Sequence, residues 1–513
     1  MVKLSWPILL LCSCSLSYAG PVQVPGLTVP ANVGPGNQTI VKEIFQKSYA
    51  VYSKFAFGHD EVLPISETFV DDLGGWGATI FDALGTLDLF NEALAFVGKV
   101  DFNTTIDDPI DLFETTIRYV GGMISAYELT GKKHDILIQQ ATQLVDKMAI
   151  AYRNNVAEIG TLDLEWSRLS LYTGNQTYTE LTEGAVRAVA NLLTYHPAGF
   201  PAQLIDPSDN QFVDDFVTWG GGTDSYLEYL IKYARITNTD DNLFADTWHA
   251  AVDSSIKNLL RTSTVGDHVY LADWNAGEIL LEGSHLACFS GGNWILGGKL
   301  LNNQTIVDIG LAVTDACWNT YAGTETGIGP EAFEFMAANG TFSQPNAEQL
   351  AFYNEHGYWI TTSDYIQRPE VLESNFYAWR ATGDTKYLDR ASSAIQSFQK
   401  FLIAEKSGGY AGLNNVNDVT QGQNDETQSF WFAEVLKYLY LTFDDPSNIS
   451  LDEFVFNTEC QVFEAPPAKP VYGSGSPRAA SGTFGTKTSN GLPIPAISPG
   501  AGSVAPGPPS GGQ

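Results

Sequence analysis

Carboxylates and hydroxyls recur among aromatic and aliphatic residues in five short blocks of this chain. The blocks are FETTIR (113–118), TDSYLEYL (223–230), HLACF (285–289), RPEVLES (368–374) and FNTE (456–459). Apolar interiors rarely accept unpaired carboxylates, so acids in such surroundings favour a functional site over a plain core. Hydrolysis of a glycosidic bond needs two carboxyl groups, one protonated and one ionised. The blocks therefore predict a sugar-cleaving site.

Two of these blocks pair their charged residues at helical spacing. Glu114 precedes Arg118 by four residues, so the two side chains would share one helix face. A surface ion pair would give the same spacing. Asp224 and Glu228 repeat the pattern directly after a run of glycines, and Asp224 could instead simply cap its helix.

A third block also places acidic residues at the start of an expected helix. Pro369 favours a helix start, and Glu370 and Glu373 then fall in the first turn. Helices that open in this way would aim their acids at one end of a ring of helices. A closed ring would bring them together although they are far apart in sequence.

The elements expected to position these acids are helices, because apolar residues recur with helical period along most of the chain. The expected helices cover residues 110–129, 136–152, 178–195, 224–236, 243–260, 306–321, 370–382, 386–403 and 428–443. Several end in Thr-Gly turns, which are typical helix stops. Short strands or hairpins are expected in Gly-rich connections such as 263–283. The predicted fold class is all-α, a ring of paired helices with minor hairpins.

The first residues have the composition of an export signal. Lys3 gives a positive start, residues 6–16 are apolar, and Ser17-Tyr18-Ala19 provides a cleavage site before Gly20. We therefore predict a secretory signal peptide over residues 1–19. A membrane anchor is the alternative, but the apolar run is short for a bilayer-spanning helix.

The remaining chain divides by composition into three parts. Residues 20–36 form an N-terminal segment, and residues 37–463 read as one folded unit that exceeds the usual domain size. A ring of helix pairs accommodates that size because each pair packs against the next. Pro, Gly, Ser and Ala dominate residues 464–513, which we predict to be a disordered tail.

The net charge and the glycosylation sequons indicate the partners and the compartment of the protein. The formal net charge is −32 at pH 7 and the pI is about 4.4, which argues against nucleic acid as a partner. This acidity fits a secreted protein working at mildly acid pH, or it serves only solubility. Six N-x-[ST] sequons predict glycosylation at Asn37, Asn103, Asn175, Asn303, Asn339 and Asn448.

Removal of the signal peptide would leave three cysteines, Cys288, Cys317 and Cys460. An oxidising compartment favours one pair and one leftover thiol. Cys288 and Cys317 stand at the ends of two helical patterns, so we predict a disulfide between them. Cys460 would then be free or paired between chains. No cysteine or histidine spacing suggests a zinc site.

Taken together, the blocks resemble those of the class I α-1,2-mannosidases, inverting and calcium-dependent glycoside hydrolases with an (α/α)7 barrel. The resemblance covers about residues 38–463. The matching blocks, in the family's order, are GWGATIFDAL (75–84), FETTIRYVGGMISAYELTG (113–131), LEWSRLS (164–170), TDSYLEYL, HLACF with Cys317, TGIGPE (326–331), RPEVLESNFYAWRATGD (368–384), FAEVLKYLYLTF (432–443) and LDEFVFNTE (451–459).

The resemblance implies roles for three carboxyl groups. Glu114 would be the general acid, acting through a water, and Glu370 the general base that activates the attacking water. Asp224 would be a third acid at the scissile bond. Inverting enzymes need acid and base far enough apart to admit that water. The residues implied to contact substrate are Arg118, Glu165, Gly222, Glu228, His285 and Glu373.

The resemblance also implies a Ca²⁺ cofactor. Thr458 would bind the ion through its hydroxyl and carbonyl, with waters completing the shell. Glu373, Glu434 and Glu459 would hold those waters. Without the resemblance, Thr458 would be interpreted as a turn residue and Glu434 as a buried helix acid.

The sequence departs from the family pattern in three places. The family continues FNTE with Ala-His-Pro, where this chain has Cys460-Gln461-Val462. Ser284 precedes His285 where an Asp is usual, and Gln428 stands where an acid is common. We expect these changes to weaken metal affinity, because they remove charge from the groups that hold coordinated waters.

Gly222 bears on specificity. Members that trim one particular branch carry Arg at this position, whereas a small residue would leave room for several branches. The expected partner is therefore a high-mannose oligosaccharide or glycoprotein, trimmed broadly by a monomer that is secreted or resides in the lumen of the secretory pathway. A non-catalytic mannose-binding lectin on the same scaffold is the main alternative, and another helical-ring glycosidase acting on glucan is the third.

Overall fold

The computed structural model describes residues 20–86, 90–106, 110–154, 160–192, 197–206 and 211–478. The predicted signal peptide and residues 479–513 of the predicted tail lie outside these ranges. Within them, no helix combines the length and the apolar character needed to cross a membrane.

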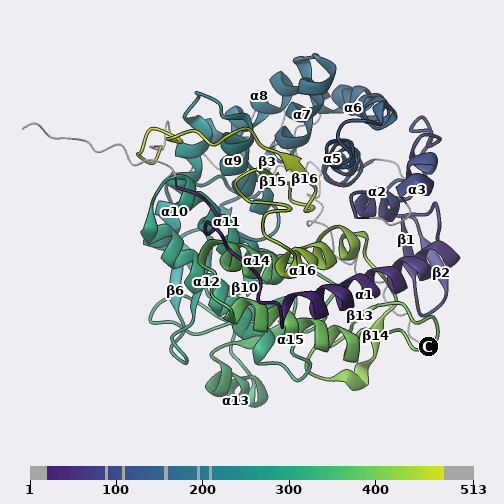
Figure 1. The fold of residues 1–513 in the computed structure, drawn as a ribbon. Helices are drawn as coiled ribbons and strands as arrows, with labels where there is room; N and C mark the ends of the chain where they lie inside the picture. Colours follow the sequence, from purple (N-terminus) through teal and green to yellow (C-terminus); the bar gives the residue numbers. More distant parts are fainter. Residues whose placement is uncertain are drawn as a thin grey trace, which may run out of the picture.

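Helices of the described residues pack as seven pairs arranged in a double ring (Figure 1). The inner members are α2 (Ala78–Ala83), α4 (Leu112–Glu114) continuing through η1 (Thr115–Val120) into α5 (Gly121–Leu129), α7 (Asp163–Thr173), α9 (Asp224–Thr237), α11 (Phe289–Leu300), α14 (Glu370–Thr382), and η4 (Trp431–Val435) continuing into α16 (Leu436–Phe443). Their outer partners are α3 (Phe90–Val97), α6 (Asp135–Asn154), α8 (Thr177–Asn191), α10 (Leu243–Asn258), α12 (Gln304–Ala322), α15 (Lys386–Phe401) and α1 (Gly34–Phe55).

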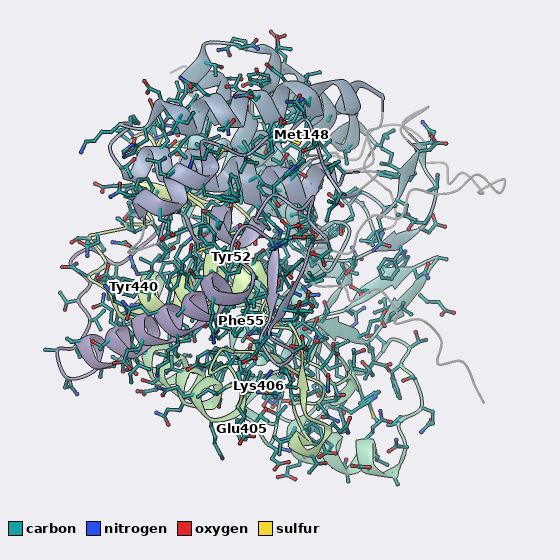
Figure 2. The ribbon with its side chains drawn as sticks, turned by 90° about the vertical axis from the view of Figure 1, so that its right-hand side faces the viewer. Tyr52, Phe55, Met148, Glu405, Lys406 and Tyr440 are labelled. Carbon is teal, nitrogen blue, oxygen red and sulfur yellow. A yellow bond between two sulfur atoms is a disulfide. The ribbon has the colours of Figure 1, made fainter. Side chains whose placement is uncertain are left out.

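The inner ring is closed. Each inner helix contacts the next, from α2 through α5, α7, α9, α11 and α14 to α16, and η4 contacts α2 again. The first outer helix, α1, packs on α16 near the opposite end of the chain; Figure 2 labels Tyr52 and Phe55 of α1 and Tyr440 of α16. Helix α13 (Ala347–His356) is not a member of these pairs.

Large aromatic side chains fill the space between the rings. Trp166 on α7, Trp294 on α11, Trp379 on α14 and Trp431 on η4 are all fully buried. Close approach of α11 and α12 depends on glycine, because a Cβ added at Gly291 would lie 2.4 Å from Thr314 Oγ1. This packing holds the N-termini of the inner helices in fixed relative positions.

The strands are short and antiparallel. They pair as β1 (Glu61–Leu63) with β2 (Thr68–Val70), β3 (Ile205–Asp206) with β4 (Gln211–Phe212), β6 (Leu260–Thr262) with β7 (Val269–Leu271), β13 (Gly412–Leu413) with β14 (Gln423–Asn424), β15 (Phe454–Phe456) with β16 (Val462–Glu464), β8 (Asp273–Asn275) between β5 (Phe216–Val217) and β9 (Glu278–Leu280), and β11 (Ala332–Glu334) between β10 (Glu282–Ser284) and β12 (Trp359–Thr362). The β15–β16 hairpin contacts the inner helices α9 and α5, so its connecting loop reaches the inside of the ring.

Most expected helices occur with small shifts at their ends, and the hairpins expected around 263–283 are present. Two expected helices, 110–129 and 428–443, each contain a π-helical turn, which sequence periodicity does not indicate. Such turns are frequent at functional sites. Helices α1, α2, α3, α7, α11 and α13 were not among the predicted ranges.

The packed structure extends past residue 463, where the sequence suggested that a disordered tail begins. Tyr472 is buried, and its hydroxyl donates to Asn238 Oδ1 at 2.8 Å. Lys469 Nζ bonds the Thr239 carbonyl and Asp240, and the backbone N–H of Ser474 donates to Asp246. Composition missed this segment because its order comes from contacts with the ends of α9 and α10 rather than from a periodic pattern of its own.

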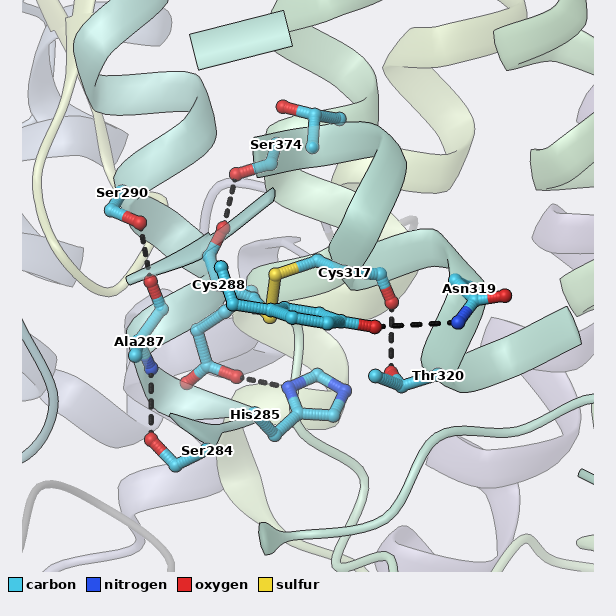
Figure 3. The surroundings of a disulfide bond; sticks show 12 residues. Ser284, His285, Ala287, Cys288, Ser290, Cys317, Asn319, Thr320 and Ser374 are labelled. Carbon is cyan, nitrogen blue, oxygen red and sulfur yellow. Dashed lines mark hydrogen bonds and ion pairs between the residues drawn. A yellow bond between two sulfur atoms is a disulfide. The ribbon is translucent and has the colours of Figure 1, made fainter. Parts of the chain in front are cut away.

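The predicted disulfide between Cys288 and Cys317 is present and joins the start of α11 to α12 (Figure 3). Cys460 is a free thiol in this chain and is buried. Burial raises the pKa of this thiol to about 12. Its backbone carbonyl accepts a hydrogen bond from Lys437 at 2.7 Å.

Candidate active site

Glu114 lies at the N-terminal end of an inner helix and is 7% exposed. The side chain of Asp111 caps this helix by accepting from the Glu114 backbone N–H at 2.9 Å. The Glu114 carboxylate accepts from Arg118 Nε at 2.9 Å and from its Nη2 at 2.8 Å. The i,i+4 pair expected from sequence is therefore formed, and it is buried rather than on the surface.

Arg118 contacts other groups besides Glu114. Its Nη1 also contacts Asp82 at 3.2 Å, the Ser429 hydroxyl at 2.9 Å, and Glu459. One buried guanidinium is thus shared among three carboxylates. Burial raises the pKa of Glu114 to about 7 despite Arg118, which acts to lower it.

Glu370 is the first residue of α14 and has a different neighbourhood. Its Oε2 lies 2.7 Å from Nδ1 of His285, and its Oε1 lies 4.0 Å from Arg368 Nη1. Arg368 also bonds Glu331. Burial acts to raise the pKa of Glu370, but the hydrogen bond with His285 and the charge of Arg368 outweigh it and hold this pKa below its ordinary value.

Asp224 is the first residue of α9, and its Oδ1 accepts from the Ser225 backbone N–H at 2.9 Å. Burial, followed by the negative charges of Glu228 and Glu370, raises the pKa of Asp224 to about 7. Glu228 itself is paired with Lys232 one turn along the helix. Asp224 and Glu370 therefore face a common region, as the sequence predicted.

Thr458 lies in the β15–β16 loop inside the ring. Asn457 shapes this loop, since its Oδ1 accepts the backbone N–H groups of Glu459 at 2.9 Å and Gln461 at 2.7 Å. Its Nδ2 donates to Glu165 Oε1 at 2.7 Å, and Tyr229 donates to the same oxygen at 2.8 Å. Thr458 is thereby placed between the inner helices that carry Glu165 and Tyr229.

Carboxyl groups are concentrated beside this loop. Burial raises the pKa values of Glu373, Glu434 and Glu459 well above normal. Glu434 is further affected by Glu459, Glu370 and Glu373, so these acids lie within electrostatic range of one another. Carboxylate and hydroxyl oxygens are the ligands that a hard cation such as Ca²⁺ takes, and a bound cation would favour the ionised form of these acids. The side-chain types beside Thr458 are therefore ones that suit a cation.

A separate group of carboxylates was not anticipated. Ligand oxygens of Glu61, Asp72 and Glu426 lie within 4.8 Å of one another. Glu61 also accepts the backbone N–H of Ser429 at 2.7 Å, which links this group to the surroundings of Arg118.

Gly222 does not border open space. The space beside Gly222 is filled, because a Cβ placed there would lie 2.6 Å from Gln203 Cγ. Gln203 is held in place by a 2.7 Å bond from its Nε2 to the Gly221 carbonyl, and Gly222 has a φ of +93°. The small residue therefore accommodates Gln203 and a left-handed backbone, and does not leave the open room that we expected.

The two substituted positions of the expected calcium surroundings have local roles. Ser284 accepts the Ala287 backbone N–H at 3.1 Å, at the start of the helical turn that follows His285. The backbone N–H of Gln428 donates to Gln367 at 3.0 Å.

The sequons fall in two groups. Asn103, Asn175, Asn339 and Asn448 are exposed, as surface glycosylation requires. Asn37 lies within α1 and donates to the Val33 carbonyl at 3.1 Å, and Asn303 caps α12 by accepting from Ile306. Asn37 therefore lies in a helix and Asn303 at a helix start, unlike the four exposed sequons.

Several residues of the site were missed. Asp82, Glu331, Arg368 and Asn457 stand in blocks that carried the resemblance, yet none was assigned a role. Tyr321, whose hydroxyl lies 2.8 Å from His285 Nε2, gave no signal in sequence. Their importance comes from contacts between segments that only the folded ring brings together.

Comparison with known proteins identifies the family. The profile of glycosyl hydrolase family 47 matches residues 44–156 and 153–465. The chain belongs to glycosyl hydrolase family 47. Family 47 is metal-dependent.

Curated relatives of this family 47 chain cover most of its length. A probable mannosyl-oligosaccharide α-1,2-mannosidase 1B of Aspergillus clavatus is 38% identical over 475 residues, which cover 82% of this chain and 91% of that protein. A mannosyl-oligosaccharide α-1,2-mannosidase 1B of Aspergillus phoenicis is 36% identical over 508 residues, covering 89% and 97%.

Among solved structures, the α-1,2-mannosidase from Trichoderma reesei is 35% identical and superimposes with a TM-score of 0.79. The match covers 84% of this chain and 99% of that one. The predicted (α/α)7 barrel is thereby confirmed for this family 47 chain.

Proposed function

We propose that this protein is a mannosyl-oligosaccharide α-1,2-mannosidase that removes terminal α-1,2-linked mannose with inversion. The observation that carries the proposal is the opposite setting of two buried carboxyl groups on the inner ring. The pKa of Glu114 is raised to about 7, and that of Glu370 lies below normal. At mildly acid pH, Glu114 therefore holds a proton while Glu370 is ionised, which is what acid and base need.

In the proposed reaction, Glu370 takes a proton from water as the water oxygen attacks the anomeric carbon. Glu114 gives its proton to the leaving glycosidic oxygen, through a second water. The bond to the aglycone breaks as the bond to water forms on the opposite face, so the product is β-mannose. Asp224, near Glu370 and half-buried, would contact the reacting sugar. The implied sugar-contacting residues Arg118, Glu165, Glu228, His285 and Glu373 also remain part of the proposal.

Calcium is the metal that we propose for Thr458, with Glu373, Glu434 and Glu459 around it. When bound, Ca²⁺ would supply positive charge that attracts sugar hydroxyl oxygens. The chain's own contribution is the loop geometry set by Asn457 and the negative charge of the buried acids. We keep the prediction that Ser284 and Gln428 weaken this site, because lost supporting interactions typically cost ~10–100-fold in metal affinity.

The proposed substrate is a high-mannose oligosaccharide or glycoprotein, and the proposed setting is secretion or the lumen of the secretory pathway. Support comes from the predicted signal peptide and from the names of the Aspergillus relatives. We propose that the enzyme acts as a monomer and carries glycans at its exposed sequons.

The decisive experiment follows hydrolysis of an α-1,2-mannobioside by proton NMR. We expect β-mannose to appear first. Initial release of the α-anomer would contradict an inverting mechanism, and glycan binding without release would favour the lectin alternative.

A chelator titration tests the metal part separately. Removal of Ca²⁺ should lower both the melting temperature and the rate of release, because the ion recognises only the folded barrel. Restoration by Ca²⁺ but not by Mg²⁺ would support calcium. No response of either quantity would remove the metal from the proposal.

Branch preference depends on Gln203 as well as on Gly222. Gly222→Arg alone should destabilise the fold, because φ is +93° and Gln203 occupies the space. The double variant Gln203→Gly with Gly222→Arg should accommodate the guanidinium and narrow trimming toward one branch. The ratio of product isomers from a high-mannose glycan measures this, with Gln203→Gly as the control.

A further inference from the structure

A chain of buried polar groups leads from Glu370 through His285 to Tyr321 on the outer ring. His285 is 1% exposed, and its Nδ1 lies 2.7 Å from Glu370 Oε2. Its Nε2 lies 2.8 Å from the hydroxyl of Tyr321, which is fully buried on the outer helix α12. Both ring nitrogens of His285 therefore have one defined partner each.

The disulfide links the two segments that carry these polar groups. Cys288 follows His285 by three residues, and Cys317 precedes Tyr321 by one helical turn. The covalent link thus ties the segment of His285 to the part of α12 that carries Tyr321. Figure 3 shows His285 next to the disulfide.

We propose that Tyr321 is a positioning residue that sets the tautomer of His285. If the Tyr321 hydroxyl donates its proton to Nε2, that nitrogen carries no hydrogen, and the single proton of the neutral ring sits on Nδ1. Nδ1–H then donates to the Glu370 carboxylate and stabilises its ionised form. Tyr321 thereby acts on the general base through His285, without touching the sugar.

The other charged groups around Glu370 do not replace the hydrogen bond that His285 donates to it. Negative groups near it come from several elements: Asp224 on α9, Glu331 before β11, Glu373 on α14 and Glu434 on η4. Each disfavours a second negative charge. His285, Arg368 (which also bonds Glu331) and a backbone hydrogen bond at Glu370 itself act in the opposite direction. The hydrogen bond from His285 is the one that Tyr321 controls.

Tyr321→Phe tests the proposal by its pH profile. Without the hydroxyl, the ring loses its reason to keep the proton on Nδ1, and an Nδ1 lone pair facing Glu370 favours the protonated carboxyl. The acid limb of kcat/KM should move to higher pH. We expect a roughly tenfold loss at mildly acid pH and a much smaller loss near neutrality, as befits one hydrogen bond to a charged group.

The matched control is Tyr358→Phe, which removes another buried hydroxyl beside α12. Tyr358 donates to the Thr320 carbonyl at 3.0 Å and has no contact with His285 among the described hydrogen bonds. Tyr358→Phe should lower the melting temperature about as much as Tyr321→Phe does, and should leave the shape of the pH profile unchanged. Equal profiles for the two variants would overturn the proposal and leave Tyr321 a structural role.

A second measurement does not depend on a folded variant or on activity. In the wild-type protein with ¹⁵N-labelled histidine, the His285 resonances, assigned by their loss in His285→Gln, should report protonated Nδ1 and unprotonated Nε2. An Nε2–H tautomer, or a doubly protonated ring over the active pH range, would overturn the proposal. This inference rests on Glu370 being the base, but the NMR result stands even if Glu370→Gln retains activity, so the two failures are distinguishable.

Discussion

Glu114 and Glu370 occupy similar places and have opposite acidities. Each is a buried carboxyl at the N-terminal end of an inner helix, and each has a cationic or hydrogen-bonding partner. Yet the pKa of Glu114 is raised to about 7, whereas that of Glu370 is lowered. Glu114 even has the closer arginine.

The difference lies in how many carboxylates share each cationic or hydrogen-bonding partner. Arg118 faces Asp82 and Glu459 in addition to Glu114, so its one positive charge cannot offset the burial of all three. Glu370 is supported by two groups, His285 and Arg368, and the Tyr321 hydroxyl at His285 Nε2 adds no competing carboxylate. The comparison teaches that the local balance of charge, rather than the nearest partner, decides which carboxyl is the acid and which the base.

The largest effect should come from removing the base. Glu370→Gln should lower kcat by ~10²–10⁴-fold, because the amide cannot take the proton of the attacking water. Affinity for a glycan should change little, since the contacts to sugar hydroxyls remain. Single-turnover hydrolysis and calorimetry measure the two quantities. Glu405→Gln, at an exposed position, is the control for charge alone, and activity close to that of this control would remove Glu370 from the mechanism.

Glu114→Gln should lower kcat less than Glu370→Gln does, on the order of 10²-fold, because solvent can still protonate the leaving oxygen slowly. The wild-type rate should fall as pH rises through about 7, where Glu114 loses its proton. In Glu114→Gln that limb should vanish, since the amide does not titrate. A limb that persists near pH 7 would assign it to Asp224, whose pKa is also about 7.

Arg118→Met probes the shared cation through stability. It leaves Asp82 and Glu459 buried without their positive partner, and breaking such a buried arrangement typically costs about 3–5 kcal/mol. Urea denaturation measures the free energy of unfolding. Arg390→Met breaks a more exposed pair with Asp315 and should cost less than about 1 kcal/mol. Equal losses would mean that Arg118 is not the centre of a charge cluster.

The smallest effect should come from Asp82→Asn. The Asp82 charge helps to raise the pKa of Glu114, and its removal also leaves Arg118 with one competitor fewer. The basic limb should therefore move to lower pH, with kcat at the optimum within a few-fold of wild type. Ser429→Ala removes a neutral partner of the same guanidinium nitrogen and should leave the limb in place. An upward shift in Asp82→Asn would contradict the shared-cation account.

Much of the site could be anticipated from sequence. Glu114, Asp224 and Glu370 lie at or near inner-helix N-termini, as the blocks predicted, and the Cys288–Cys317 disulfide is present. Local patterns suffice here, because helix starts, i,i+4 spacing and periodicity are properties of contiguous residues. The all-α class follows for the same reason.

The tertiary structure alone decided how charge is distributed. Arg118 and Glu459 are 341 residues apart in sequence, and only closure of the ring makes them partners. The same closure brings Tyr321 to His285 and orders residues 464–478 against α9 and α10. A chain's local pattern determines which groups are available, but acidity depends on burial and on every charge nearby. Those quantities exist only once distant segments have packed together.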